Sequence, residues 1–205
     1  GIDPEEAHAL YRRMQRMPGV VPRGLHFHLG SQITRLEPFV EAIRRVSELW
    51  GALRKEGIEL RYLDIGGGLG IPYGDGEAPP GPAEYARAVC SQVGSLQPLE
   101  LILEPGRAVV GNAGVLLTRV LYTKRRAGKR FAVVDAGMND LLRPSLYGAR
   151  QEIRPLRRDE GPRVPVEVVG PVCESGDVLG RGCSLPDLRP GDLLAIMGAG
   201  AYGFS

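Results

Sequence analysis

Segments with helical periodicity alternate with β-rich segments through the first half of the chain. The β-rich runs lie at 24–30, 59–66 and 99–106, and helical patterns at 38–56 and 82–96 separate them. Strands separated by helices do not readily pair antiparallel with their neighbours in sequence, so this order predicts βαβ units and a parallel sheet. A closed barrel and an open doubly wound sheet both satisfy the pattern.

The second half of the chain has a different pattern. Its β-rich runs are short, show little helical periodicity and lie at 114–122, 130–137, 164–171 and 192–200. We therefore predict a boundary near Val110–Gly114, with part of an α/β domain at 1–112 and a predominantly β domain at 113–205.

Composition and charge exclude several classes of protein. The 205 residues carry 26 basic and 24 acidic side chains, a formal net charge of +2, which does not favour a nucleic-acid partner. No apolar stretch reaches the roughly 20 residues that cross a membrane. The three cysteines lack CxxC spacing, which argues against a disulfide framework or a structural zinc site. We expect a cytoplasmic protein with no metal site and no nucleic-acid or membrane partner.

Polar motifs follow the three predicted strands of the first half: HFHLGS at 26–31, DIGGGLG at 64–70 and LEPGR at 103–107. A parallel barrel carries its active site at the C-terminal ends of its strands, so these motifs predict a site there. His26 and His28 are two residues apart and face the same side of the sheet, either as core histidines or as site residues. HxH can also bind metal, but no carboxylate or further histidine has the usual spacing.

Glycine and charged residues in these motifs suit an anionic ligand. The consecutive glycines Gly66–Gly68 let the backbone approach a phosphate closely, and Ser31 adds a hydroxyl; a flexible turn is the alternative. Glu104 can hold a proton on a ring nitrogen, and Arg107 can pair with a phosphate or carboxylate. An ion pair between Glu104 and Arg107 is the alternative.

The second half adds further candidates. Arg143 and Tyr147 in RPSLY suit a substrate carboxylate, unless they form only a surface turn. Tyr202 is either a binding hydroxyl or a packing ring. In GPVCESGD, Cys173 has the acids Glu174 and Asp177 nearby, which oppose a free thiolate, and read alone it is a small buried apolar side chain.

Taken in order, the motifs HFHLGSQI, LDIGGGLGIPY, LEPGRAVVGNAG, VDAGMNDLLRPSLYGA, VGPVCESGD and GDLLAIMGAGAYGFS resemble those of the diaminopimelate decarboxylases. The resemblance implies pyridoxal 5'-phosphate as cofactor. It also implies the C-terminal part of a TIM-like (β/α)8 barrel that binds this cofactor, followed by part of a β-rich barrel or sandwich domain.

The resemblance assigns a role to each motif. Cofactor binding falls to His28, Ser31, Gly66, Gly67, Gly68, Glu104, Pro105, Gly106, Arg107 and Tyr202. Substrate binding falls to Arg107, Arg143, Tyr147, Glu174 and Tyr202. Cys173 returns the proton to the carbon that loses CO2.

The implied reaction is decarboxylation of meso-2,6-diaminopimelate to L-lysine and CO2, the last step of lysine biosynthesis. The implied assembly is a homodimer whose sites are shared across the interface. Arg143 and Glu174 favour a substrate with a carboxylate and an ammonium at its remote end. Related ornithine and arginine decarboxylases usually carry aspartate after the cysteine. The alternatives are a decarboxylase of another basic amino acid and a noncatalytic homologue.

The chain departs from the family at one essential residue. Family members attach the cofactor to a lysine near the end of the first barrel strand. The chain contains only Lys55, Lys124 and Lys129, none of which follows a predicted strand of the first half. Three strands are also too few to close a barrel. We therefore expect an internal fragment that is inactive as given.

Overall fold

The computed structural model describes residues 1–74, 78–96, 99–158 and 161–204. The chain forms two compact units. The first consists of Gly1–Gly70 and Ala78–Ala108, and the second of Ile71–Glu77 and Val109–Ser205. Among the described residues, no helix combines the length and apolarity needed to span a bilayer.

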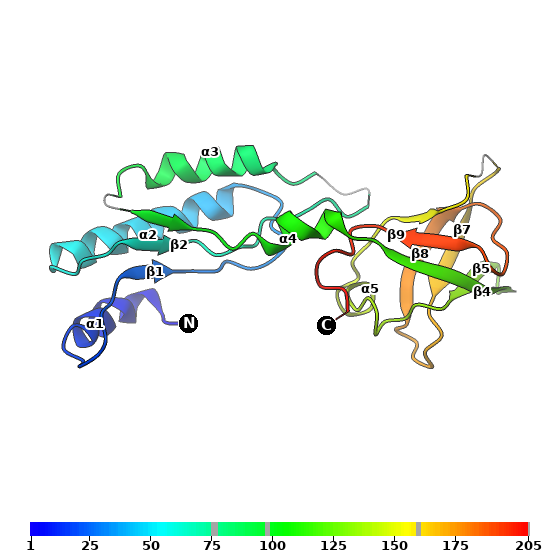
Figure 1. The fold of residues 1–205 in the computed structure, drawn as a ribbon, viewed down its shortest axis with the longest axis horizontal. Coiled ribbons are helices and arrows are strands. Elements are labelled where there is room, and N and C mark those ends of the chain that lie inside the picture. Colours follow the sequence, from blue (N-terminus) through cyan, green and yellow to red (C-terminus); the bar gives the residue numbers. More distant parts are fainter. Residues whose placement is uncertain (75–77, 97–98, 159–160, 205) are drawn as a thin grey trace. The chain divides into compact units, whose positions relative to one another are not determined.

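The first unit is a parallel three-stranded sheet with helical crossovers (Figure 1). Its elements are α1 (Pro4–Met14), β1 (Gly24–His26), α2 (Glu37–Lys55), β2 (Tyr62–Asp64), α3 (Pro82–Val93), β3 (Glu100–Ile102) and the start of α4 (Gly106–Val110). The strand order is β1-β2-β3, and all neighbours pair parallel. The predicted parallel βαβ arrangement is confirmed, although each strand is shorter than its β-rich run.

Helices α2 and α3 pack on this sheet through one apolar face. Phe39, Ile43, Trp50 and Leu53 of α2 are buried, and they join Leu25 and Leu63 of the strands in one core. Tyr85 of α3 meets the Phe39 ring edge-on at a centroid distance of 4.9 Å. This core fixes the strands whose C-terminal ends carry the polar motifs.

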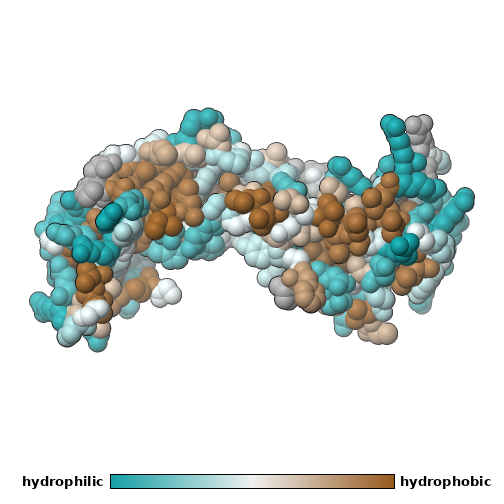
Figure 2. All heavy atoms as spheres, viewed as in Figure 1, coloured by the Kyte–Doolittle hydropathy of each residue, from teal (hydrophilic) through white to brown (hydrophobic). Residues whose placement is uncertain are grey.

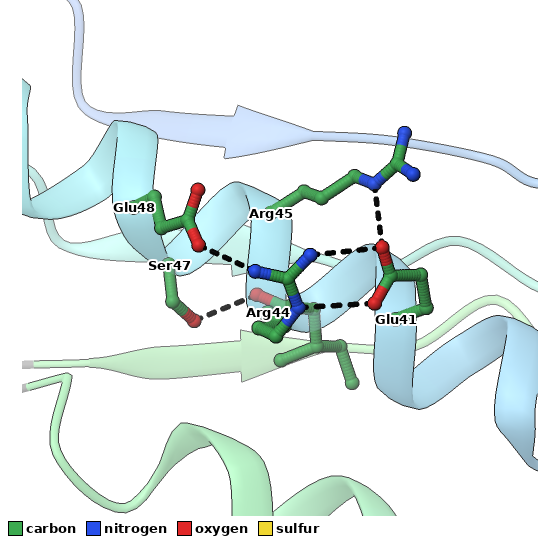
Figure 3. Close-up of polar contacts among 6 residues, drawn as sticks. Glu41, Arg44, Arg45, Ser47 and Glu48 are labelled. Atoms are coloured by element: carbon green, nitrogen blue, oxygen red, sulfur yellow. Dashed lines mark hydrogen bonds and ion pairs between the residues drawn. The ribbon is translucent and has the colours of Figure 1, made fainter.

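The opposite face of α2 carries ion pairs at helical spacing (Figure 3). Arg44 donates to Glu48 at 2.6 Å and to Glu41 at 2.9 Å, and Arg45 donates to Glu41 at 2.8 Å. The hydrogen bonds from Arg44 and Arg45 lower the pKa of Glu41 to about 2. This charged ladder lies on the solvent face, which leaves only the apolar face for the sheet.

The second unit is built around a six-stranded sheet. Its elements are η1 (Gly111–Ala113), β4 (Leu116–Arg126), β5 (Lys129–Val134), α5 (Arg143–Tyr147), β6 (Ile153–Pro155), β7 (Val164–Val169), β8 (Val178–Leu185) and β9 (Leu193–Ile196). The strand order is β6-β9-β4-β5-β7-β8, and only β5 and β7 pair parallel. The predicted β-rich second half is confirmed.

The two end strands of that order approach each other. A Cβ added at Gly180 of β8 would lie 2.7 Å from Cδ1 of Ile153 in β6, so the sheet is nearly closed there. The inner face is a separate apolar core that includes Val120, Val134, Val168, Leu179 and Ile196. Three elements lie outside the β-rich runs on which the sequence prediction relied: the short strand β6, the glycine-containing strand β8 and the one-turn helix α5.

Candidate active site

The C-terminal ends of the three parallel strands bring the first group of predicted residues together. His26, Asp64 and Ile102 occupy matching positions at the ends of β1, β2 and β3. The three polar motifs continue directly from these positions along one edge of the sheet. The geometric reason for expecting a site at this edge therefore holds within the first unit.

The glycine turn after β2 is shaped by close contacts between chain segments. Gly66 N–H donates to Asp64 Oδ1 at 2.9 Å, and Gly67 N–H donates to His28 Nδ1 at 3.3 Å. A Cβ at Gly67 would overlap the Glu104 carbonyl oxygen, while Gly66 and Gly68 have φ values of +67° and +100°. Packing requires glycine at position 67, and backbone conformation favours it at positions 66 and 68, whether or not a ligand binds.

One backbone donor of the turn remains available. Among the described residues, Gly68 N–H has no hydrogen-bond acceptor, whereas its carbonyl accepts from Ile33 N–H at 2.9 Å. Close contacts of all three glycines with neighbouring segments favour a fixed turn over the flexible-turn alternative, which stays untested. The contact of Gly67 N–H with His28 Nδ1 favours the tautomer of the neutral ring that carries its proton on Nε2.

Ser31 and Arg107 meet although 76 residues separate them. Arg107 Nη2 donates to Ser31 Oγ at 2.7 Å, and Arg107 is only 4% exposed. Residues 103–105, which include Pro105, connect β3 to α4, and α4 begins at Gly106 and carries Arg107. A hydroxyl and a guanidinium are thus held side by side at the edge of the sheet, as an oxyanion ligand requires.

Glu104 lies beside His26 and Asp64. Glu104 Oε2 is 3.8 Å from His26 Nε2, and one possible ligand atom from each of the three residues lies within 4.8 Å of the others. Sequence spacing missed this cluster because the fold assembles it from three separate strand ends. His26 and Glu104 are about half exposed, so the cluster is open to solvent, and the expected absence of a metal site stays a prediction.

The second unit surrounds Arg143 with aromatic rings. The guanidinium carbon lies 5.1 Å from the ring centroid of Tyr147 and 5.6 Å from that of Tyr202. A third ring, Tyr73, lies at 5.9 Å. Tyr202 has φ +54°, a left-handed conformation that is uncommon outside glycine. Sequence reasoning paired Arg143 with Tyr147 but missed Tyr73, which comes from a segment 70 residues away.

The CESGD turn is organised by Asp177. The Asp177 carboxylate is 3% exposed and accepts hydrogen bonds from Met138 N–H at 2.7 Å and Val172 N–H at 2.8 Å. Cys173 and Glu174 are exposed, so the interpretation of Cys173 as a buried apolar side chain is wrong. Glu174 Oε1 accepts from Gly176 N–H at 3.1 Å. The turn therefore presents a thiol and a carboxylate on an anchored backbone.

The second unit also contains a large cavity of about 1220 Å³, whose lining includes Tyr73 and Pro144, the chain neighbour of Arg143. It is lined by six arginines, Arg150, Arg154, Arg157, Arg158, Arg163 and Arg181. None of the residues predicted to bind cofactor or substrate belongs to its lining.

Comparison with known proteins gives consistent results along the chain. The sequence pattern of the family described as pyridoxal-dependent decarboxylase, C-terminal sheet domain, matches residues 11–200. Diaminopimelate decarboxylase of Vibrio cholerae is 48% identical over 205 residues, which are all of this chain and 49% of that protein. The Pseudomonas aeruginosa enzyme of the same name is also 48% identical, over all of this chain and 48% of its own length.

Solved structures agree with these matches. The crystal structure of diaminopimelate decarboxylase from Helicobacter pylori complexed with L-lysine has a TM-score of 0.92 and 43% identity, covering 99% of this chain and 50% of that one. Lysine/ornithine decarboxylase from Vibrio vulnificus, complexed with cadaverine, has a TM-score of 0.89 and 27% identity, covering 99% of this chain and 55% of that one. The chain spans about half the length of the relatives that it matches.

Proposed function

This chain belongs to the pyridoxal-dependent decarboxylase family, and we propose that it forms part of a diaminopimelate decarboxylase. The reaction converts meso-2,6-diaminopimelate to L-lysine and CO2, the last step of lysine biosynthesis. The observation that carries this proposal is the 48% identity to the Vibrio cholerae enzyme over all 205 residues.

The residues at the strand ends fit pyridoxal phosphate. Ser31 and Arg107 form a paired hydroxyl and guanidinium, and Gly68 contributes a backbone N–H with no acceptor among the described residues. These donors suit the phosphate group. When bound, the cofactor supplies an electron sink for the pair of electrons left when CO2 departs. Glu104 would hold the proton on the pyridine nitrogen, and the His28 ring would stack on the cofactor.

The second unit contributes the groups for substrate and proton transfer. Arg143 and Tyr147 would bind the remote carboxylate, and Glu174 would bind the remote ammonium. Tyr202 would contact both cofactor and substrate, and Arg107 would also contact the substrate. Cys173 would donate its S–H proton to the carbon from which CO2 leaves, a step that needs a protonated thiol. The exposed position of Cys173 and Glu174 on the anchored turn supports these roles.

We propose that the 205 residues are inactive by themselves, because none of their lysines lies at the carboxyl ends of the parallel strands. Lys55 is the last residue of α2, and α2 runs antiparallel to the strands, so Lys55 lies toward the opposite edge of the sheet (Figure 1). Lys124 and Lys129 belong to the β4–β5 hairpin. The lysine that holds the cofactor would come from residues outside this sequence.

The domain division, the assembly and the location are further parts of the proposal. Residues 1–112 would be part of a cofactor-binding barrel, and 113–205 part of a β domain. Exposed apolar side chains of β4, such as Leu117 and Leu121, are consistent with an interface in a homodimer, and Figure 2 shows apolar side chains on the visible face of each unit. The free cysteines fit the reducing cytoplasm.

A decarboxylase of another basic amino acid is the second candidate, because a lysine/ornithine decarboxylase shares the fold at a TM-score of 0.89. A noncatalytic homologue is a third, because no cofactor lysine is present. The test is CO2 release by the full-length protein, loaded with pyridoxal phosphate, from meso-diaminopimelate, ornithine, arginine and carboxynorspermidine. Release chiefly from meso-diaminopimelate is expected. Faster release from ornithine would favour the second candidate, and no release from any substrate the third.

A further inference from the structure

Three tyrosines from separate parts of the second unit surround the Arg143 guanidinium. Tyr73 comes from the segment that follows Gly70, Tyr147 from the end of α5, and Tyr202 from the loop after β9. Their ring centroids lie 5.9, 5.1 and 5.6 Å from the guanidinium carbon. Each distance is within the range of a cation–π interaction.

These ring contacts restrain the cation through cation–π interactions, which do not occupy its N–H donors. Aromatic faces attract a guanidinium through the ring quadrupole, whereas a carboxylate binds to the N–H groups in its plane. Arg143 Nε is buried and has no hydrogen-bond partner among the described residues. A buried donor without an acceptor is costly, so the site is prepared for an anion.

Tyr73 is the ring with the most independent support. Tyr147 is four residues from Arg143, so helical spacing alone brings it close, and Tyr202 is 55% exposed. Tyr73 is partly buried and packs against Gly198: a Cβ added there would lie 3.3 Å from Tyr73 Cε1. Gln151, which is 5% exposed, donates to the Gly198 carbonyl at 3.3 Å and so helps to hold that backbone.

We propose that Tyr73 is a positioning residue that holds the Arg143 guanidinium in place for the remote carboxylate of the substrate. This inference rests on the proposed function, because it takes the remote carboxylate of diaminopimelate as the anion. It adds a specificity determinant from a segment that none of the predicted site residues occupies. The effect of Tyr73 is therefore expected only on ligands that carry this carboxylate.

Two small ligands, one with the remote carboxylate and one without it, test whether the effect of Tyr73 depends on this group. The product L-lysine keeps the remote carboxylate of meso-diaminopimelate, whereas cadaverine has the same carbon chain and two amines but no carboxylate. Inhibition by L-lysine and by cadaverine is measured on the full-length enzyme loaded with pyridoxal phosphate, together with KM and kcat for meso-diaminopimelate. The variants are Tyr73→Leu, Tyr73→Phe and the control Tyr62→Leu, which removes a ring at the start of β2 that lies 5.4 Å from the guanidinium carbon of Arg61.

Tyr73→Leu is expected to raise KM and the inhibition constant of L-lysine by about three- to tenfold, which is the loss of one cation–π contact. It should leave kcat and the inhibition constant of cadaverine within about twofold of wild type, as for a group that acts in binding alone. Tyr73→Phe, which keeps the ring, and Tyr62→Leu, which removes a ring from a different arginine, should behave as wild type. Should Tyr73→Leu fail to fold, Tyr73→Met, which keeps bulk without a ring, carries the same test.

Equal losses for L-lysine and cadaverine would overturn the inference, as would an unchanged KM or a loss in Tyr73→Phe as large as that in Tyr73→Leu. Each of these results leaves the proposed function standing, provided that the wild-type enzyme releases CO2 from meso-diaminopimelate. If the wild-type enzyme does not, the proposed function fails, and the role of Tyr73 fails with it.

Discussion

Replacing Asp177 with asparagine should loosen the turn that carries Cys173. The buried carboxylate accepts two backbone hydrogen bonds, from Met138 N–H at 2.7 Å and from Val172 N–H at 2.8 Å. Asparagine keeps one acceptor oxygen and turns an NH2 group toward the other N–H. The change removes one hydrogen bond to a charged group and leaves a buried donor unsatisfied, at a cost of about 2–4 kcal/mol.

Amide hydrogen exchange on the full-length protein measures this change where it occurs. A loss of about 2 kcal/mol in local stability corresponds to roughly thirtyfold faster exchange at Met138 and Val172. Asp187→Asn is the matched control, because the Asp187 side chain is 80% exposed and forms a surface ion pair with Arg130 at 3.3 Å. Exposed pairs of this kind contribute little to stability.

The expected pattern is faster exchange in Asp177→Asn at both amides, with a lower kcat, and no change in Asp187→Asn. Exchange at Met138 and Val172 that is equally slow in both variants would refute the assignment of Asp177 as the anchor of the turn. So would faster exchange throughout the protein, because the effect would then not be local.

Two further predictions concern packing and pH. Gly67→Ala places a Cβ against the Glu104 carbonyl oxygen, so it should cost about 1–3 kcal/mol in thermal unfolding and weaken cofactor binding. Gly81→Ala, which meets open space, should cost much less, and equal losses would contradict the packing argument. Hydrogen bonds from a backbone N–H and from the buried Thr118 hydroxyl lower the pKa of Asp135 below its ordinary value of 3.8. The stability that ionised Asp135 contributes is therefore present above pH 3.8 and lost as the pH falls through the lower pKa of the folded state. Wild type should be more stable than Asp135→Asn near neutral pH, and the difference in unfolding free energy should shrink in acid. A difference that grows in acid would contradict the lowered pKa.

Periodicity predicted the parallel sheet of the first unit because its strands and helices have regular apolar patterns. It missed β8, in which Gly180 and Gly182 interrupt the apolar alternation, although pairing with β7 makes it a strand. Short β6 was missed because three residues are too few to show a period. Tertiary pairing decides such segments more than local preference does.

The sequence indicated which residues belong to the site, but not which of them contact one another. The motif after β2 indicated a phosphate turn, yet the contact of Gly67 with Glu104 depends on where β3 lies, which no local pattern encodes. The same holds for the pair of Arg107 with Ser31. Tyr73 ends the motif LDIGGGLGIPY, but nothing in that motif indicated a contact with Arg143, because the two meet only when distant segments come together in the folded unit.

The central claim is tested most directly by the full-length protein, loaded with pyridoxal phosphate and given meso-diaminopimelate. Wild type is expected to release CO2 and form L-lysine in equal amounts, whereas Cys173→Ala should keep the cofactor absorbance and lose turnover. Absence of CO2 release by wild type would contradict the proposed decarboxylase. Normal turnover by Cys173→Ala would contradict the assignment of Cys173 as the proton donor.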